Sequence, residues 1–133
     1  MKQIKTVGKR KRAVARATAS EGTGIIRVNK LPISSYFSSA YRQLRVEEPS
    51  IIAPDAAKKI DIDILVRGGG SMGQADAVRL AIANAIVKFT KDKKIESAFL
   101  QYDRHMLIAD VRRKEMRKPN DSKARAARQK SYR

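Results

Sequence analysis

The residues whose spacing most suggests a chemical site form the glycine-rich run from Gly68 to Gly73, which matches the GxGxxG pattern of dinucleotide-binding loops. The run follows an alternating strand pattern and precedes a helical one, as such a loop does. A dinucleotide site also requires a second strand ending in an acidic residue roughly 20 residues further on. Here Asp92 directly follows the helical pattern, and no Gly-Lys-Ser/Thr ending marks a P-loop. A cofactor site is therefore disfavoured, and two interpretations stay open: a tight turn, or a turn whose amides bind an RNA phosphate.

Other catalytic arrangements are missing from the sequence. Its single histidine is His105 and it has no cysteine, so neither a Ser/His/Asp triad nor a histidine or thiolate metal site is expected. Asp61 and Asp63 share one face of a predicted strand, where we expect a solvated or charge-neutralised role rather than paired-carboxylate catalysis. We therefore predict no enzymatic activity, no catalytic residue, no metal and no cofactor.

Positive charge is concentrated at the two ends of the chain. The 133 residues include 30 Lys and Arg against 13 Asp and Glu, which gives a net charge of +17. Residues 1–16 hold seven basic and no acidic residues, residues 112–133 hold ten basic and two acidic ones, and the middle is left with only +2. Two basic arms on a nearly neutral domain indicate a polyanionic partner, because net charge informs about partners rather than about fold.

The N-terminal basic cluster lies on a predicted strand. Its members are Lys9, Arg10, Lys11, Arg12 and Arg16. Alternation along the strand predicts that Arg10, Arg12 and Arg16 share one face while alanines fill the other. No acidic residue precedes Arg16 in the chain to relieve the repulsion. We therefore predict that this cluster contacts RNA; a merely solvated face is the alternative.

The C-terminal segment, residues 112–133, carries almost no large apolar side chain, so it cannot bury enough surface to offset the entropy of ordering. We predict an extended basic tail that orders on RNA, where arginine can donate paired hydrogen bonds to phosphate. A tail that only improves solubility is the alternative. The predicted rRNA-binding residues of the tail are Arg112, Arg113, Arg117, Lys118, Lys123, Arg125 and Arg128.

Periodicity predicts one α/β domain over residues 1–111, followed by the basic tail. Strands are expected at residues 3–7, 10–19, 25–30, 59–67 and 106–109, with 10–30 forming a hairpin. Helices are expected at residues 33–37, 41–52, 72–91 and 94–102. No apolar run reaches the roughly 20 residues of a membrane span. The N-terminus lacks a secretory signal pattern, so a cytoplasmic location is expected.

Four segments carry a resemblance to a known family. They are Gly8–Ala17, Gly68–Gly70 with Gly73–Ala77, Tyr102–Arg104 and Arg128–Arg133. Together they resemble the universal small-subunit ribosomal protein nine family along nearly the whole chain, and the closing Ser-Tyr-Arg resembles its archaeal type. Val111 departs from the pattern, because the family commonly has proline between this aspartate and arginine.

The resemblance implies an α+β domain with a ribosomal protein S5 domain 2-like fold: a mostly antiparallel four-stranded sheet, helices on one side and a left-handed βαβ crossover. It also implies a structural constituent of the small ribosomal subunit, bound to rRNA in the head beside neighbouring head proteins. The tail would then approach the anticodon stem-loop of the P-site tRNA. The tRNA-binding residues implied in this way are Lys130, Ser131, Tyr132 and Arg133.

Two other functions fit parts of the sequence. A free-standing nucleic-acid binder would share the charge, but it would not need two basic arms and would not sediment with ribosomal subunits. A nucleotide-binding enzyme would rest on the glycine-rich run alone, and it would show saturable binding of ATP or NAD. The four segments together are far more specific than charge, so a ribosomal protein with no small-molecule substrate and no membrane partner is the prediction.

Overall fold

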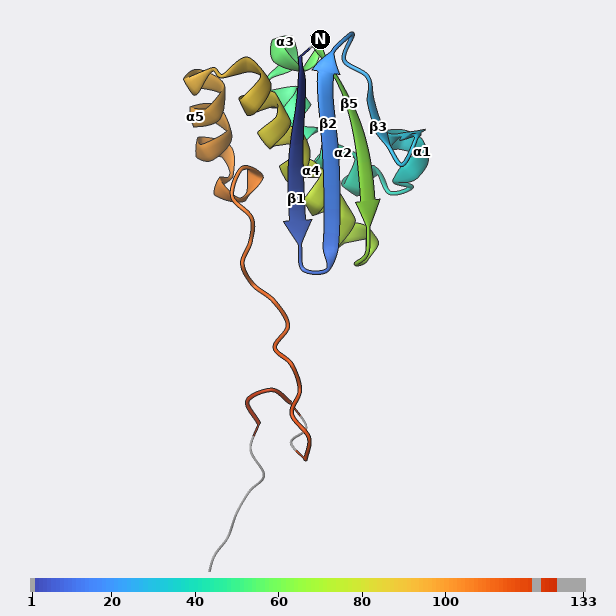
Figure 1. The fold of residues 1–133 in the computed structure, drawn as a ribbon, viewed down its shortest axis with the longest axis vertical. Coiled ribbons are helices and arrows are strands. Elements are labelled where there is room, and N and C mark those ends of the chain that lie inside the picture. Colours follow the sequence, from blue (N-terminus) through green and yellow to red (C-terminus); the bar gives the residue numbers. More distant parts are fainter. Residues whose placement is uncertain (1, 121–122, 127–133) are drawn as a thin grey trace, which may run out of the picture.

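A single sheet backed by helices forms the domain of the computed structural model, which describes residues 2–120 and 123–126 (Figure 1). The strands are β1 (Gln3–Arg10), β2 (Ala13–Glu21), β3 (Ile26–Val28), β4 (Leu31–Pro32) and β5 (Ile60–Arg67). The helices are α1 (Ile33–Tyr36), α2 (Ala40–Ile52), α3 (Pro54–Ala57), α4 (Ser71–Thr90), α5 (Lys93–Tyr102) and the 3-10 turn η1 (Arg104–Met106). The predicted α+β class is confirmed, and the predicted helices and the strand at 59–67 lie within a few residues of the observed ones.

The sheet differs from the expected one. Its five strands are ordered β1-β2-β5-β3-β4, and it is mixed, because β3 runs parallel to β5 while the other pairs are antiparallel. The predicted number of four strands is therefore wrong, whereas the pairing is mostly antiparallel as predicted, with β3–β5 as the one parallel pair among the described strands. The predicted hairpin over residues 10–30 is also wrong, because β2 pairs with β1 on one edge and with β5 on the other.

Two local features explain this pairing. Lys11 has a φ of 53°, which lets Lys11 and Arg12 close a tight turn between β1 and β2. At the other end of β2, the carboxylate of Asp61 accepts hydrogen bonds from the backbone N–H groups of Thr23, Gly24 and Ile25. Those bonds lower the pKa of Asp61 and hold the loop across the end of β5, so that β3 joins the far edge of that strand.

Small residues let α4 lie close to β1 and β2. The side chains of Ala13, Ala15, Ala17 and Ala19 are at most 1% exposed and form one face of β2. A Cβ on Gly8 would lie 2.0 Å from the carbonyl oxygen of Ala77, so only glycine fits at this crossing of β1 and α4. Thr6 donates a hydrogen bond of 2.9 Å to the carbonyl of Ala81. The alanine-rich sequence of this helix is therefore a packing feature.

Helix α4 covers one face of the sheet over β1, β2 and β5, and α2 packs against α4 on the same side (Figure 1). Within the described residues, no element covers the opposite face of the sheet. The strand predicted at residues 106–109 is wrong, because η1 ends at Met106 and residues 107–109 form no strand. Asp103 accepts the N–H of His105 to begin that turn, and the side chain of Met106 is fully buried in the core.

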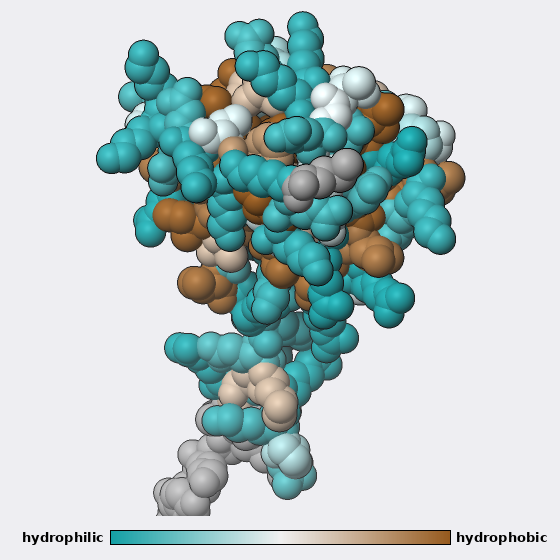
Figure 2. Space-filling model, turned by 45° about the horizontal axis from the view of Figure 1, so that its top comes forward, coloured by the Kyte–Doolittle hydropathy of each residue, from teal (hydrophilic) through white to brown (hydrophobic). Residues whose placement is uncertain are grey.

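The described part of the tail contains no helix or strand and runs away from the domain (Figure 1). Its surface is mostly hydrophilic, whereas apolar residues appear between the polar ones on the domain (Figure 2). Among the described residues, no helix combines the length and apolar character that a membrane crossing requires.

Candidate nucleic-acid interface

An open groove of about 1150 Å³ lies where the β1–β2 turn, the glycine-rich turn and the start of the tail meet. Arg10, Lys11 and Arg12 line it from the β1–β2 turn. The described part of the tail contributes Arg112, Arg113, Lys114 and Arg117, together with one acidic residue, Glu115. The fold therefore joins the two basic arms, which are about 100 residues apart in sequence, into one cationic surface.

The glycine-rich turn forms one wall of this groove. Gly68 and Gly69 have φ values of 77° and 68°, a backbone conformation that glycine adopts readily and other residues rarely do. Gln74 closes the turn by donating from its side-chain amide to the carbonyl of Gly68 at 3.1 Å. The interpretation of this run as a tight strand-to-helix turn is confirmed, and Gly70 and Gly73 bring its backbone to the groove.

Asp110 fastens the start of the tail to the domain. Its carboxylate accepts hydrogen bonds from Nε and Nη2 of Arg112, at 3.0 and 2.6 Å, and also pairs with the guanidinium of Arg10. The hydrogen bonds from the Arg112 side chain, more than any other contact, hold the pKa of Asp110 well below its usual range. Arg10 also lies 3.7 Å from Asp76, which accepts a 2.9 Å hydrogen bond from Arg45. The first residue of the tail is thus anchored through a chain of ion pairs.

The prediction that Arg10, Arg12 and Arg16 share one strand face is wrong. Arg10 ends β1 and is half-buried on the helix side, Arg12 lies in the turn, and Arg16 is exposed on the open face. The strand breaks at Lys11, whose positive φ reverses the chain, so the alternation does not continue through the cluster. Carboxylates distant in sequence also neutralise Arg10, which inspection of residues 1–16 alone could not reveal.

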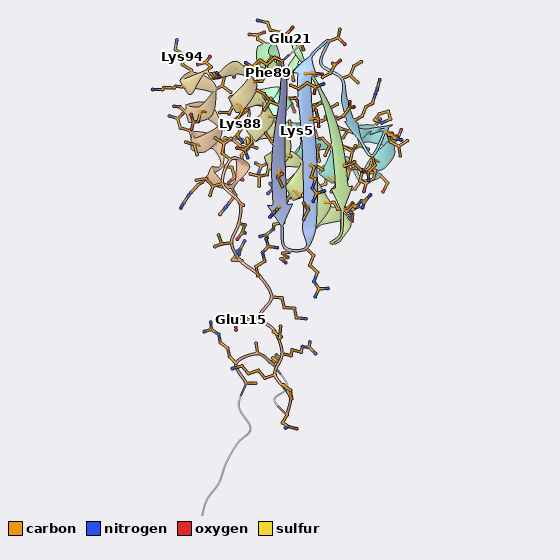
Figure 3. The ribbon with its side chains drawn as sticks, in the orientation of Figure 1. Lys5, Glu21, Lys88, Phe89, Lys94 and Glu115 are labelled. Atoms are coloured by element: carbon orange, nitrogen blue, oxygen red, sulfur yellow. The ribbon has the colours of Figure 1, made fainter. Side chains whose placement is uncertain are left out.

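The remaining predicted residues of the tail divide into two groups. Arg113, Arg117, Lys118 and Lys123 are exposed, and no ion pair among the described residues includes them. Arg125 donates to Glu115 at 2.6 Å, and Figure 3 labels Glu115 on the tail. The predicted residues Arg128, Lys130, Ser131, Tyr132 and Arg133 lie outside the described residues.

A buried arginine was missed by the sequence analysis. Arg79 of α4 is only 3% exposed, and it forms ion pairs with Asp103 at 3.0 Å and with Glu48 of α2 at 2.6 Å. The contact with Glu48 is an ion pair by distance rather than an aligned hydrogen bond. Burial acts to raise the pKa of Asp103, but hydrogen bonds from His105 and Arg79 outweigh it and lower the pKa. The sequence signal for a buried arginine was the position of Arg79 among the apolar residues of the predicted helix.

Comparison with known proteins gives consistent matches. A family model described as "Ribosomal protein S9/S16" matches residues 8–133. The chain is 49% identical to "Small ribosomal subunit protein uS9" of Methanococcus maripaludis strain C7 over 135 residues, covering all of both chains. It is 51% identical to the protein of the same name from Thermoplasma acidophilum over 128 residues, which cover 96% of this chain and 98% of that one. The protein of that name from Methanothrix thermoacetophila is 45% identical over 133 residues.

The matches extend over the domain and the tail alike, and these relatives are archaeal. The family consists of structural ribosomal proteins, which confirms the predictions that the chain is not an enzyme and that it lies in the cytoplasmic ribosome. Within residues 2–120 and 123–126, no group of three metal-binding side chains is present. The chain belongs to the ribosomal protein S9 family and is a protein of the small ribosomal subunit.

Proposed function

We propose that the chain binds rRNA in the head of the small subunit through its basic turn and tail, and that the tail tip contacts the P-site tRNA. The observation that carries this proposal is the groove in which Arg10–Arg12 face the start of the tail. Among the described residues, seven basic side chains and one carboxylate line it, a composition that favours a polyanion over a neutral or cationic ligand.

Most basic side chains of the groove have no carboxylate partner among the described residues and can bind phosphate. Asp110 pairs with Arg10 and Arg112, but no ion pair among the described residues includes Lys11, Arg12, Arg113, Lys114 or Arg117. Arginine suits phosphate because its planar group donates two parallel hydrogen bonds. Because the chain leaves the domain at Asp110 without helix or strand, these side chains can follow a phosphate backbone.

The proposal divides the chain into a domain, residues 1–111, and a tail, residues 112–133. Its rRNA-binding residues are Lys9, Arg10, Lys11, Arg12, Arg16, Arg112, Arg113, Arg117, Lys118, Lys123, Arg125 and Arg128. Its tRNA-binding residues are Lys130, Ser131, Tyr132 and Arg133, which rest on the family resemblance. We also propose that the domain has the ribosomal protein S5 domain 2-like fold with its left-handed βαβ crossover. The parallel pair of β3 and β5, which are connected through helices α1 to α3, supports a βαβ unit.

Deletion of residues 122–133 tests the rRNA part. The deletion removes five basic residues, so the slope of log affinity for small-subunit rRNA against log salt should flatten by about 0.7–0.9 for each lost phosphate contact. The melting temperature of the domain should stay unchanged, because its core lies within residues 1–111. An unchanged salt slope, or a large loss of thermal stability, would contradict the proposal.

Replacement of the last residue tests the tRNA part separately. Arg133→Gln in reconstituted small subunits should weaken retention of P-site tRNA more than it weakens subunit assembly. Filter binding of labelled tRNA to purified mutant subunits measures the effect. Equal tRNA affinity in mutant and unaltered subunits would count against the contact of the tail tip while leaving the rRNA part intact.

A further inference from the structure

The face of the sheet that turns away from the helices carries a second group of basic residues. Lys5 and Lys9 of β1, Arg16 of β2 and Arg67 of β5 are all exposed on it. Figure 3 labels Lys5 on β1, with the helices behind the sheet, whereas Lys88 and Lys94 are labelled on the helical side. Lys5 and Arg67 belong to no cluster that the sequence indicated, and only strand pairing brings these four together.

The strand register keeps these cations from lying directly opposite one another. Arg16 lies between Val7 and Leu65, and Val14 lies between Lys9 and Arg67. Like charges directly opposite in a sheet are destabilising, whereas aliphatic neighbours can pack along the stems of lysine and arginine. The register therefore lets four positive side chains share one face, because no two of them lie directly opposite each other and none needs a carboxylate partner.

Acidic residues on this face are few and lie toward one end of it. Asp61 accepts the three backbone N–H groups of the loop before β3, and Asp63 lies beside Arg27 in the parallel register. Both lie toward the end of β5 that is remote from the groove. No ion pair among the described residues includes Lys5, Lys9, Arg16 or Arg67. The part of the face nearest the β1–β2 turn is therefore uniformly positive.

Aliphatic rather than aromatic residues separate the cations on this face. Val7 and Leu65 flank Arg16 in the register and are 50% and 57% exposed. Aromatic side chains are absent from the outward positions of β1, β2 and β5, so bases have no stacking platform there. An open sheet face with spaced cations and aliphatic residues fits a sugar-phosphate backbone.

We propose that the open face of the sheet is a further RNA-binding surface, which takes the sugar-phosphate backbone of small-subunit rRNA through Lys5, Lys9, Arg16 and Arg67. The proposal rests on the proposed function, because it takes rRNA as the partner. It adds Lys5 and Arg67 to Lys9 and Arg16, which the proposed function already includes, and extends RNA contact from the turn and tail to the sheet of the domain. Contact of this kind positions a protein without reading base sequence.

Site-specific cross-linking tests this surface. Because the chain has no cysteine, Leu65→Cys gives one attachment point for a photoactivatable aryl azide at the centre of the face. Leu44→Cys on α2 is the matched control, since the two leucines are 57% and 58% exposed on opposite sides of the sheet. In reconstituted small subunits, we expect an rRNA adduct at position 65 that falls at least fivefold when Arg16→Gln and Arg67→Gln are added.

Other outcomes would overturn the proposal. The first is the absence of any adduct at position 65, or an adduct there with protein alone. The second is a pair of rRNA adducts at positions 65 and 44 that do not depend on Arg16 and Arg67. Lys114→Cys reports on the groove independently. An rRNA adduct at position 114 without one at position 65 would remove this inference and leave the proposed function standing, whereas no adduct at position 114 would remove the proposed function.

Salt dependence gives a second readout that needs no cysteine. Lys5→Gln, Arg16→Gln and Arg67→Gln together should flatten the salt slope of rRNA binding by about 0.7–0.9 per replaced contact. The melting temperature should not fall, because all three side chains are exposed. A slope equal to that of the unaltered chain would overturn the proposal.

Discussion

The arginines of the helical layer and those of the tail contrast in what surrounds them. Arg79 is 3% exposed and lies against two carboxylates, whereas Arg113 and Arg117 are exposed and belong to no ion pair among the described residues. Arg10 is intermediate, because it lines the groove and is also paired with Asp110. The same residue type therefore stabilises the fold where a carboxylate is in reach, and is available to a partner where none is.

Replacement of Arg79 should have the largest effect on stability. Arg79→Met would leave Glu48 and Asp103 without their common partner, and breaking a buried ion pair from one side costs about 3–5 kcal/mol in the free energy of unfolding. Urea denaturation followed by circular dichroism measures the loss. A cost below 1 kcal/mol would show that Arg79 is not a structural arginine in this sense.

Acid should destabilise the domain through Asp103. Its pKa in the folded chain lies below the ordinary value of 3.8, so its contribution is present above that pH and is lost as the pH falls through the lowered pKa. Melting temperatures from pH 7 to pH 2 should fall mainly below pH 4, and Asp103→Asn should reduce both the value at pH 7 and the acid-induced drop. An equal acid-induced drop in the variant would assign the effect to other carboxylates.

Arg45→Gln should have a smaller effect. Arg45 is 30% exposed in its side chain and pairs with Asp76, which Arg10 also approaches at 3.7 Å. A partly exposed pair contributes up to about 1 kcal/mol, and Asp76 keeps a positive neighbour after the change. Urea denaturation of both variants compares their free energies of unfolding. A loss for Arg45→Gln as large as that for Arg79→Met would contradict the contrast between buried and partly exposed arginines.

The smallest effect on stability is expected for Arg113→Gln with Arg117→Gln. Both side chains are exposed on a segment without helix or strand, so their replacement removes no described contact within the domain. The melting temperature should equal that of the unaltered chain within error in differential scanning calorimetry. A clear decrease would show that the tail packs on the domain and contributes to its stability.

The helices and the central strand could be predicted because their sequence periods are strong. The stripe that includes Ala75, Val78 and Ile82 marks α4, and alternation marks β5. Strand order could not be predicted, because the position of β3 depends on the loop that Asp61 holds and on its parallel pairing with β5. These contacts join residues far apart in sequence.

The basic arms were predictable from composition, but their arrangement was not. A turn made by Lys11 at positive φ carries no glycine or asparagine to mark it, so the strand pattern was extended through Arg10 and Arg12. The partners Asp76 and Asp110 lie 66 and 100 residues beyond Arg10. Spacing within one segment cannot reveal such pairs, and for the same reason the open face with Lys5 and Arg67 could not be predicted.

The most direct test compares how strongly rRNA binding depends on salt when arginines without an ion-pair partner are replaced and when an arginine with such a partner is replaced. If cations without carboxylate partners contact phosphate, Arg113→Gln with Arg117→Gln should lower the log–log slope by about 0.7–0.9 per contact, while Arg45→Gln leaves it unchanged. Nitrocellulose filter binding of purified chain to small-subunit rRNA over a salt series provides both slopes. Equal slopes for the two variants, or a larger change for Arg45→Gln, would contradict the division between structural and RNA-binding cations.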